Sequence, residues 1–313
     1  MTWDRDKLLM ELNEFQFGCE SSSPELLKYL EFYGLSGLAN ESVCHCVGWM
    51  DAGAFRVVLQ TYLCAEAKGT VFVFHGYFDH AGLYHHLTRH LISKGFSVVI
   101  YDMPGHGLSS GKPTAITSFD EYQEVLEGVV SHVNDKVANP LYAIGQSTGA
   151  AVLIHRASAE PENKVLFERI VLLAPLVRPE GWKGIKFIHS LIAPFAEVWR
   201  RSFSVNSTDR GFLDFLRGKD PLQSKIMSVS WVGALKSWVN SIEARDTSPR
   251  ALSVIQGTSD KTVDWAHNIP IIRRLFQNVK VTYIDQGHHH LVNESSEIRQ
   301  QVFAAVDAEF GVA

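Results

Sequence analysis

The sequence predicts an α/β fold in which a mostly parallel central sheet is covered by helices on both faces. Short, continuous apolar runs alternate with helical segments between residues 71 and 173. Continuous runs of this kind are typical of strands buried on both faces, and their alternation with helices is typical of parallel sheets. Glycine-rich turns follow the carboxyl ends of these runs, which is where such sheets bind ligands.

Each predicted element follows from its residue pattern. Leucines in residues 1–40 show helical spacing, and Phe15 falls on the same predicted helical face as Leu12. Residues 43–63 alternate around a turn at 51–53, which predicts an antiparallel hairpin. The predicted buried strands are residues 71–74, 96–100, 141–144, 170–173, 252–255 and 279–284. Strand character stops between about 175 and 250, where helical, aromatic-rich segments predict an all-helical cap over the strand ends. We therefore expect a core of 1–175 and 250–313, with an N-terminal helical extension at 1–42 and a cap at 176–249.

The composition narrows the class of protein. The chain has 313 residues, of which 46% are hydrophobic and 20% charged, as is ordinary for a soluble globular protein. A formal net charge of -5 without a Lys/Arg block argues against a nucleic-acid partner. The sequence has no apolar run near the roughly 20 residues of a membrane span, and its start lacks the features of a secretory signal. Its four cysteines are expected to be unpaired thiols, which favours a cytoplasmic location. The oligomeric state is not predicted.

A nucleophile elbow is predicted at residues 145–149, Gly-Gln-Ser-Thr-Gly, between an apolar run and a helix of small residues. In such an elbow a strand turns sharply into a helix and raises a serine hydroxyl above the sheet, here that of Ser147. Glycines flank the serine because a Cβ there would clash with a neighbouring backbone. The alternative is an ordinary glycine-rich turn after a buried strand.

A serine nucleophile needs a base within hydrogen-bond reach and a carboxylate that orients the base. Asp260 follows an apolar strand and is the candidate acid, with Asp264 as the fallback. The candidate base is one of three adjacent histidines, residues 288–290, after the last strand. Backbone N–H groups of Tyr77 and Thr148 are expected to form the oxyanion hole, one from the loop after an earlier strand and one from the residue after the serine.

Four separated motifs carry a family resemblance: residues 75–84, residues 102–111, the elbow and residues 289–294. Together they resemble the α/β-hydrolase superfamily, and within it the monoacylglycerol lipase, lysophospholipase and serine-aminopeptidase-like group. The resemblance implies an α/β-hydrolase fold over roughly residues 45–175 and 250–313. The family elbow often has Met where this chain has Thr148, and residues 1–42 are not part of the family pattern.

The resemblance also ranks the histidines. The group's base is commonly followed by Leu two positions later and Glu five positions later, and His289 fits through Leu291 and Glu294. His288 fits the simpler Gly-His pattern of the superfamily and remains the alternative base, and His290 is third.

The function expected from these residues is acyl transfer by a serine hydrolase on a monoacylglycerol, lysophospholipid or other acyl ester, without a cofactor. A serine aminopeptidase is the first alternative, in which Glu197, Asp209 or Asp214 of the cap would hold a free amine. A non-catalytic binder on the same scaffold is the second. A metal site at residues 75–80 is disfavoured, because Tyr77 replaces a histidine of the zinc-hydrolase pattern, and His75 and His106 are expected to hold turns.

The apolar side chains of the cap have two competing interpretations, an acyl pocket or a packing face, and are also compatible with transient contact with a membrane surface. They are Phe187, Ile188, Leu191, Ile192, Phe195, Trp199, Trp231 and Trp238.

Overall fold

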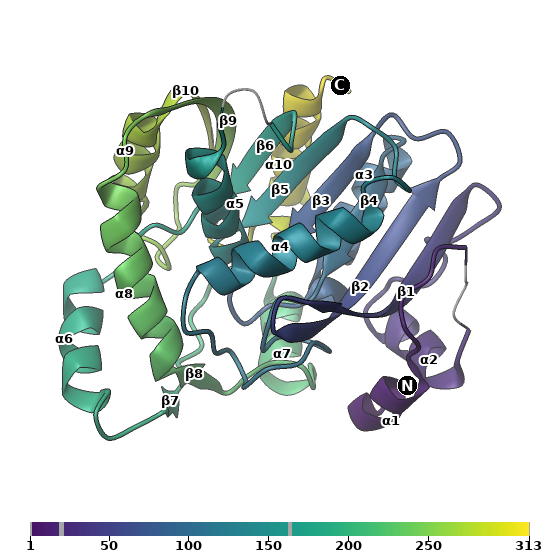
Figure 1. Cartoon of the computed structure of the whole chain (residues 1–313), viewed down its shortest axis with the longest axis horizontal. Coiled ribbons are helices and arrows are strands. Elements are labelled where there is room, and N and C mark those ends of the chain that lie inside the picture. The colour runs from purple at the N-terminus through teal and green to yellow at the C-terminus, as the bar shows by residue number, and fades with distance from the viewer. Residues whose placement is uncertain (1, 19–21, 162–164, 313) are drawn as a thin grey trace.

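One mostly parallel sheet forms the centre of the molecule (Figure 1). The computed structural model describes residues 2–18, 22–161 and 165–312. Within these residues the sheet has eight strands in the order β1-β2-β4-β3-β5-β6-β9-β10. They are β1 (Val43–Ala52), β2 (Phe55–Cys64), β3 (Thr70–Phe74), β4 (Ser97–Tyr101), β5 (Leu141–Gln146), β6 (Arg169–Leu173), β9 (Ser248–Gly257) and β10 (Phe276–Ile284). β1 pairs antiparallel with β2, and β2 with β4, whereas the other neighbours are parallel. The predicted fold class is therefore confirmed.

Helices cover both faces of this sheet, as the continuous apolar strands require. Alternate residues of β3 point to opposite faces. Phe72 and Phe74 pack with α4, α5, α8 (Val229–Glu243) and α9, while Val71 and Val73 pack with α1, α2, α3 and α10. The covering helices are α1 (Arg5–Glu11), α2 (Pro24–Phe32), α3 (His85–Ser93), α4 (Asp120–Val133), α5 (Thr148–Ala159), α9 (Trp265–Leu275) and α10 (Ser296–Phe310), with short 3₁₀ helices η1 (Ala81–Tyr84) and η2 (Leu291–Asn293). Figure 1 shows α4 in front of the sheet and α3 and α10 behind it.

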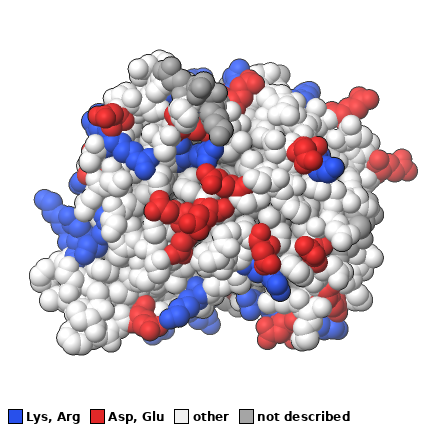
Figure 2. Space-filling model, viewed as in Figure 1, with Lys and Arg blue, Asp and Glu red and all other residues white. Residues whose placement is uncertain are grey.

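The charged residues of α4 lie on its outer side. Asp120, Glu124 and Glu127 are exposed, whereas Val125 and Val129 are buried. Figure 2 shows an acidic group near the middle of this face, where α4 runs in Figure 1. None of the described helices is both long and apolar enough to cross a membrane.

The N-terminal segment is less helical than predicted. α1 ends at Glu11, and Phe15, which we expected on a helical face, instead pairs with the edge strand β1. The Phe15 N–H donates to the Trp49 carbonyl at 2.8 Å, and the Trp49 N–H donates to the Asn13 carbonyl at 3.0 Å. Residues 13–15 pair with the outer edge of β1 because the backbone N–H and C=O groups of an edge strand need hydrogen-bond partners.

The segment between β6 and β9 contains α6 (Trp182–Ile192), α7 (Arg210–Gly218) and α8 (Val229–Glu243). The expectation that it is entirely helical is wrong, because β7 (Val198–Arg200) and β8 (Ile226–Ser228) form a small antiparallel pair. The name cap is kept for residues 176–249, and this division of the chain remains a prediction.

No disulfide joins the cysteines in the described part of the chain, where the sulfurs of Cys44 and Cys46 lie 3.6 Å apart. Cys19 lies outside the described residues.

Candidate active site

Ser147 lies on a sharp turn between β5 and α5. Its backbone has φ 53° and ψ -109°, a conformation that a non-glycine residue keeps only when its surroundings impose it. A Cβ built on Gly145 would lie 2.6 Å from the Ala150 nitrogen, and one on Gly149 would overlap the carbonyl oxygen of Phe74 in β3. The predicted elbow is therefore present, and both of its glycines are required by close backbone approach.

Asp260 and His289 meet above the carboxyl ends of β9 and β10. The Nδ1 of His289 lies 2.8 Å from Oδ2 of Asp260, and both side chains are almost fully buried. Asp260 also accepts hydrogen bonds from the Thr262 N–H at 2.7 Å and from Nε2 of Gln256 at 3.2 Å. These donors fix the carboxylate, and the carboxylate fixes the imidazole with Nδ1–H as donor and Nε2 as acceptor.

Asp260 and His289 each favour the charged form of the other. Burial alone would raise the pKa of Asp260, but the neighbouring His289 and the hydrogen bonds outweigh burial and lower the pKa. Burial alone would lower the pKa of His289, but the charge and hydrogen bond of Asp260 raise the pKa above its ordinary value. An imidazole with a raised pKa is a stronger base, provided that the pH leaves it neutral.

The two neighbouring histidines have other partners. The His288 N–H donates to Oε1 of Glu294 at 2.5 Å, and its Nδ1 lies 3.4 Å from the same oxygen. The Nε2 of His290 lies 3.1 Å from Oδ2 of Asp79. Among the described hydrogen bonds and ion pairs, only His289 of the three contacts Asp260. The fallback acid Asp264 instead caps α9, accepting from the His267 N–H at 3.1 Å.

The loop after β3 lies against Ser147. A Cβ built on Gly76 would lie 3.5 Å from the Cβ of Ser147, so the backbone before Tyr77 is close to the serine. The side chain of Tyr77 points elsewhere: its hydroxyl donates to the Thr114 carbonyl at 2.8 Å, and its ring stacks on Trp231 with 3.8 Å between centroids. Tyr77 can therefore offer its backbone to the site while its ring forms a wall.

One cavity of about 530 Å³ brings Ser147, Thr148, Tyr77 and His289 together, with Asp260 bound to the far side of the imidazole. Its apolar lining residues include Leu176, Pro179, Ile185, Met227, Trp231 and Val263, and its polar ones include Glu180, Arg201, Ser202, Ser204, Asn206 and Lys261. The cavity is therefore suited to a molecule with an apolar part and a polar part.

Two of the eight predicted acyl-pocket residues, Ile192 and Trp199, are partly buried and are not among the described lining residues of the cavity. The other six separate into three groups. Trp231 lines the cavity, whereas Trp238 is buried and stacks on Phe119 with 4.7 Å between centroids. Four others, in α6 and just after it, neither line this cavity nor pack in the core: Phe187, Ile188, Leu191 and Phe195 are 51–88% exposed. The sequence missed Leu176, Ile185, Met227 and Val263 as lining residues, because their pattern does not differ from that of core residues.

The carboxylates predicted to hold a free amine lie elsewhere. Glu197 pairs with Lys112 at 3.2 Å, and Asp209 caps α7 through the Phe212 N–H at 3.0 Å. Neither they nor Asp214 belongs to the described lining of the Ser147 cavity, in which Glu180 and Asp79 are the carboxylates present.

The histidines of the loops after β3 and β4 serve local structure. Nε2 of His75 accepts from the Met103 N–H and its Nδ1–H donates to the Gly76 carbonyl, both at 2.8 Å, while burial lowers the pKa of His75 to about 3. Nδ1–H of His106 donates to the Pro104 carbonyl at 2.9 Å. The expected role of both residues in holding turns is confirmed. Among the described residues, no group of three or more His, Cys, Asp or Glu is arranged to hold a metal ion.

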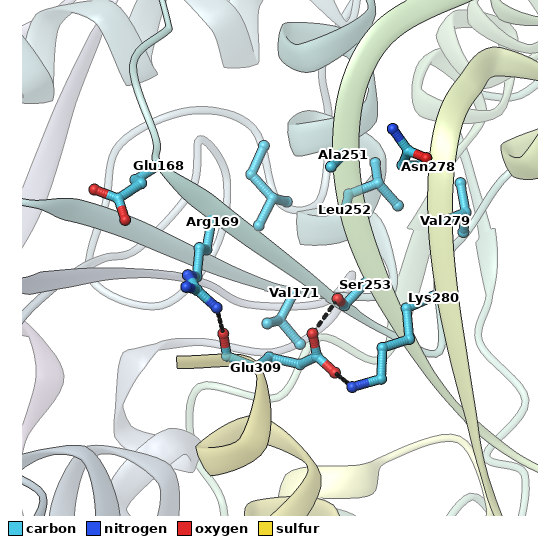
Figure 3. A pocket seen from close by; sticks show the side chains of 11 residues that line it. Glu168, Arg169, Val171, Ala251, Leu252, Ser253, Asn278, Val279, Lys280 and Glu309 are labelled. Atoms are coloured by element: carbon cyan, nitrogen blue, oxygen red, sulfur yellow. Dashed lines mark hydrogen bonds and ion pairs between the residues drawn. The ribbon is translucent and has the colours of Figure 1, made fainter. Parts of the chain in front are cut away.

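A second hollow, of about 620 Å³, lies at the amino-terminal end of β6 (Figure 3). It is formed by the first residues of β6 together with parts of β9, β10 and α10, including Arg169 and Glu309. Its charged groups bind one another, since Glu309 accepts from Ser253 and pairs with Lys280, both at 2.6 Å. Ligands of parallel sheets bind at the carboxyl ends of strands, so we assign no function to this hollow.

The segment after β10, residues 285–293, contains the candidate base His289 and is called the base loop. Two polar residues to which the sequence analysis gave no role hold this loop. Nε2 of Gln146 donates to the His289 carbonyl at 2.8 Å. The buried carboxylate of Glu294 accepts from the N–H of His288 and, at 2.6 Å, from the N–H of Thr208 in the cap. The Thr208 hydroxyl is also bonded to Glu294. Glu294, five positions after His289, thus joins the base loop to the cap.

A serine raised on an elbow beside an Asp–His pair, above a mostly parallel sheet, is the arrangement of the α/β-hydrolase superfamily. Solved structures share this fold. A soluble variant of monoglyceride lipase from Saccharomyces cerevisiae, in complex with a substrate analog, aligns with a TM-score of 0.71 and 17% identity over 83% of this chain and 92% of that chain. Monoacylglycerol lipase from Paleococcus ferrophilus aligns with a TM-score of 0.70 and 16% identity over 82% and 99%.

The family follows from the sequence match. The family model described as serine aminopeptidase, S33, matches residues 65–296, which is most of the chain, and this chain belongs to that family of hydrolases. Monoglyceride lipase from Homo sapiens is 27% identical over 252 residues, covering 77% of this chain and 81% of the relative. The monoglyceride lipase homolog from Monkeypox virus is 26% identical over 250 residues, covering 77% and 88%. Phospholipase YtpA from Bacillus subtilis (strain 168) is 24% identical over 264 residues, covering 79% and 97%.

Removal of the Glu294 carboxylate tests its structural role. The Glu294→Ala variant leaves the partly buried N–H groups of His288 and Thr208 without their acceptor, so the free energy of unfolding should fall by about 1–3 kcal/mol. Urea unfolding measures this change. Glu297→Ala, at an exposed position of α10, is the control and should stay within about 0.5 kcal/mol of the parent chain. Equal stability of the two variants would contradict the assignment.

Proposed function

We propose that this hydrolase cleaves carboxylic acyl esters through an acyl-enzyme, with Ser147 as nucleophile, His289 as base and Asp260 as the acid that orients the base. The observation that carries this proposal is the 2.8 Å contact between His289 and Asp260 at the wall of the cavity that also contains Ser147. The expected alternative base, His288, is bonded to Glu294 instead, which supports His289.

In the first half of the reaction, Nε2 of His289 takes the hydroxyl proton of Ser147 as the oxygen attacks the ester carbonyl. The imidazolium that forms is stabilised by Asp260, in line with the raised pKa of His289. The carbonyl oxygen becomes an anion, and the N–H groups of Thr148 and Tyr77 are the proposed donors to it. The imidazolium then gives its proton to the departing alcohol, which leaves an acyl group on Ser147.

In the second half, water occupies the place of the alcohol. His289 removes a proton from this water as it attacks the acyl carbonyl, and the same two N–H groups would hold the second oxyanion. Collapse of this intermediate breaks the bond to Ser147, returns the proton to the serine oxygen and releases the carboxylic acid. The residues that carry these steps are all present, so the mechanism uses no cofactor.

The substrate class follows from the cavity and the relatives. Apolar side chains, among them Ile185, Met227 and Trp231, line one part of the cavity, and hydroxyl, amide and charged groups line the rest. An acyl chain fits the first part and a glycerol-type head group the second. Because the similar proteins include monoglyceride lipases and a phospholipase, we propose a monoacylglycerol, a lysophospholipid or a related acyl ester as substrate.

Aminopeptidase activity is the second candidate, on the strength of the family description and of Glu180, a carboxylate in the cavity lining.

The cytoplasmic location remains a prediction, and so does transient contact with a membrane surface. The exposed apolar side chains of α6 support such a contact, because an apolar patch on a helix favours insertion at a lipid interface. Figure 1 shows α6 at the outer edge of the molecule, where a lipid surface could reach it.

A panel of substrates tests the bond that is cleaved. We expect turnover of p-nitrophenyl esters of graded acyl length, with aminoacyl p-nitroanilides cleaved at least about a hundredfold more slowly. Release of p-nitrophenol or p-nitroaniline measures both reactions. Cleavage of the anilides alone would favour the aminopeptidase, and a chain that neither turns over substrate nor labels at Ser147 with a fluorophosphonate would favour the non-catalytic binder.

Single substitutions test the assignment of the base. His289→Ala and Ser147→Ala should each lower kcat on a p-nitrophenyl ester by at least about 10³-fold, since triad members act as a unit. His288→Ala is the matched control and should retain kcat within about threefold, because its ring contacts Glu294 and not Asp260. Full activity of the His289 variant would overturn the assignment.

The pH dependence of ester turnover follows from the direction of the His289 shift. The base must be neutral, so kcat/KM should rise with pH and level off above a midpoint higher than the ordinary imidazole pKa of 6.5. In Asp260→Asn the charge that raises this pKa is lost, so the midpoint should move to lower pH while the maximal rate falls, by about 10⁴-fold in a comparable triad. A wild-type midpoint below 6.5 would contradict the pairing.

Substitution of the α6 side chains tests the membrane contact. Phe187→Ser combined with Leu191→Ser should lower binding to phosphatidylcholine vesicles by about tenfold or more, because each apolar side chain contributes about 1.5–3 kcal/mol when buried. Turnover of a short soluble ester should not change. Met10→Ser with Leu27→Ser removes equally exposed apolar side chains from α1 and α2 and should leave vesicle binding intact. Equal losses in both double variants would count against the cap as the contact.

A further inference from the structure

The N-terminal extension contacts the cap although it lies outside the family match, which begins at residue 65. Tyr33, the residue directly after α2, is 3% exposed. Its phenol O–H donates to Oδ1 of Asp220 at 2.6 Å, and Asp220 lies just beyond the end of α7 in the cap. A residue of the extension is therefore hydrogen-bonded to the cap in the buried interior.

Asp220 also contacts the loop after β3. Its Oδ2 lies 3.0 Å from Nε2 of His80, and neither side chain has exposed area. Burial alone would lower the pKa of His80, but the charge and hydrogen bond of Asp220, together with the charges of Asp102 and Asp79, outweigh burial and raise the pKa. Asp220 shows the opposite balance, with a lowered pKa, so the two form a buried ion pair. Such a pair is stable only when its remaining lone pairs have donors, and Tyr33 supplies one of them.

The same turn of the cap also holds Phe78, two residues before His80. Nε2 of Gln223 donates to the Phe78 carbonyl at 3.0 Å. Phe78 has φ 71°, a left-handed conformation that a non-glycine residue keeps only where its neighbours impose it. Tyr77, whose N–H is the proposed oxyanion donor, directly precedes Phe78. Bonds from Asp220 and Gln223 therefore fix the backbone on the carboxyl-terminal side of that N–H.

The ring of Tyr33 leaves little room for movement at this point. It packs edge-on against His80 with 4.9 Å between centroids and lies 6.0 Å from the ring of Phe215 in α7. A Cβ built on Gly82, in η1, would lie 2.8 Å from Cγ of Tyr33. The extension, the cap and the loop after β3 thus meet around one phenol ring.

We propose that Tyr33 is a positioning residue for ester hydrolysis, acting through Asp220 and His80 on the loop that carries the Tyr77 N–H. This inference rests on the proposed function. An oxyanion donor has to point at the place where charge develops in the transition state, so a small displacement of the loop weakens transition-state binding more than substrate binding. Loss of the Tyr33 hydroxyl therefore lowers kcat and leaves KM largely unchanged.

The test compares two Tyr→Phe variants of the full chain. Tyr33→Phe removes the O–H that bonds to Asp220 and keeps the packed ring. Tyr29→Phe is the control: Tyr29 is buried in α2, four positions before Tyr33, and its hydroxyl accepts from Gln60 of β2 at 3.3 Å. With a p-nitrophenyl ester as substrate, we expect Tyr33→Phe to lower kcat about tenfold with KM within about twofold, whereas Tyr29→Phe keeps both constants.

A second variant, Asp220→Asn, retains the shape of the side chain but removes the charge that holds His80, and should lower kcat at least as much as Tyr33→Phe. Thermal unfolding shows whether each variant is folded at the assay temperature. Equal kcat in wild type, Tyr33→Phe and Asp220→Asn would overturn this inference alone, and so would a loss confined to KM or shared equally with Tyr29→Phe. A wild-type chain without ester turnover would overturn the proposed function itself, and this inference with it.

Discussion

The close approach of three backbone segments at the elbow is the constraint on which the site depends. β5 must turn into α5 within one residue, and β3 passes so close that Gly149 has no space for a side chain. The same approach places Gly76, in the loop after β3, against Ser147, the proposed nucleophile. This geometry requires the strained, positive-φ backbone of Ser147, and the surrounding sheet, buried on both faces, maintains that conformation.

Around this fixed point the other parts of the site are tied to one another by buried polar contacts. Gln146, next to the serine, binds the carbonyl of His289, and Glu294 binds the base loop to the cap. Buried donors and acceptors of this kind are costly when unpaired, so each contact specifies the position of its partner. The Asp260–His289 pair thus depends on elements from both halves of the core and from the cap.

The sequence was sufficient to predict the parallel sheet, the hairpin and the elbow, because each has a local pattern: continuous apolar runs, alternation around a turn, and glycines at a fixed spacing. It was not sufficient for Phe15, whose helical spacing with Leu12 yielded to the unpaired edge of β1. The prediction for the outer face of α6 was wrong for a related reason. Its apolar residues have the spacing of a packed helix, and only the three-dimensional arrangement shows that Phe187 and Leu191 have nothing to pack against. Asp220 and His80 lie 140 positions apart, so no local pattern could join them.

Only part of the cap lining the cavity is hydrogen-bonded to the base loop in the described residues, and this limits which substitutions disturb the Asp260–His289 pair. The stretch before α7 is tied to the base loop: the His290 N–H donates to the Asn206 carbonyl at 2.7 Å, and the Ser207 hydroxyl donates to the Asn293 carbonyl, also at 2.7 Å. The apolar lining around Ile185 and Met227 comes from segments outside that anchored stretch. Substitutions there can reshape the apolar part of the cavity while the Asp260–His289 contact is preserved. Under the proposed function, preferences for acyl-chain length can therefore evolve without loss of the proposed acid–base pair.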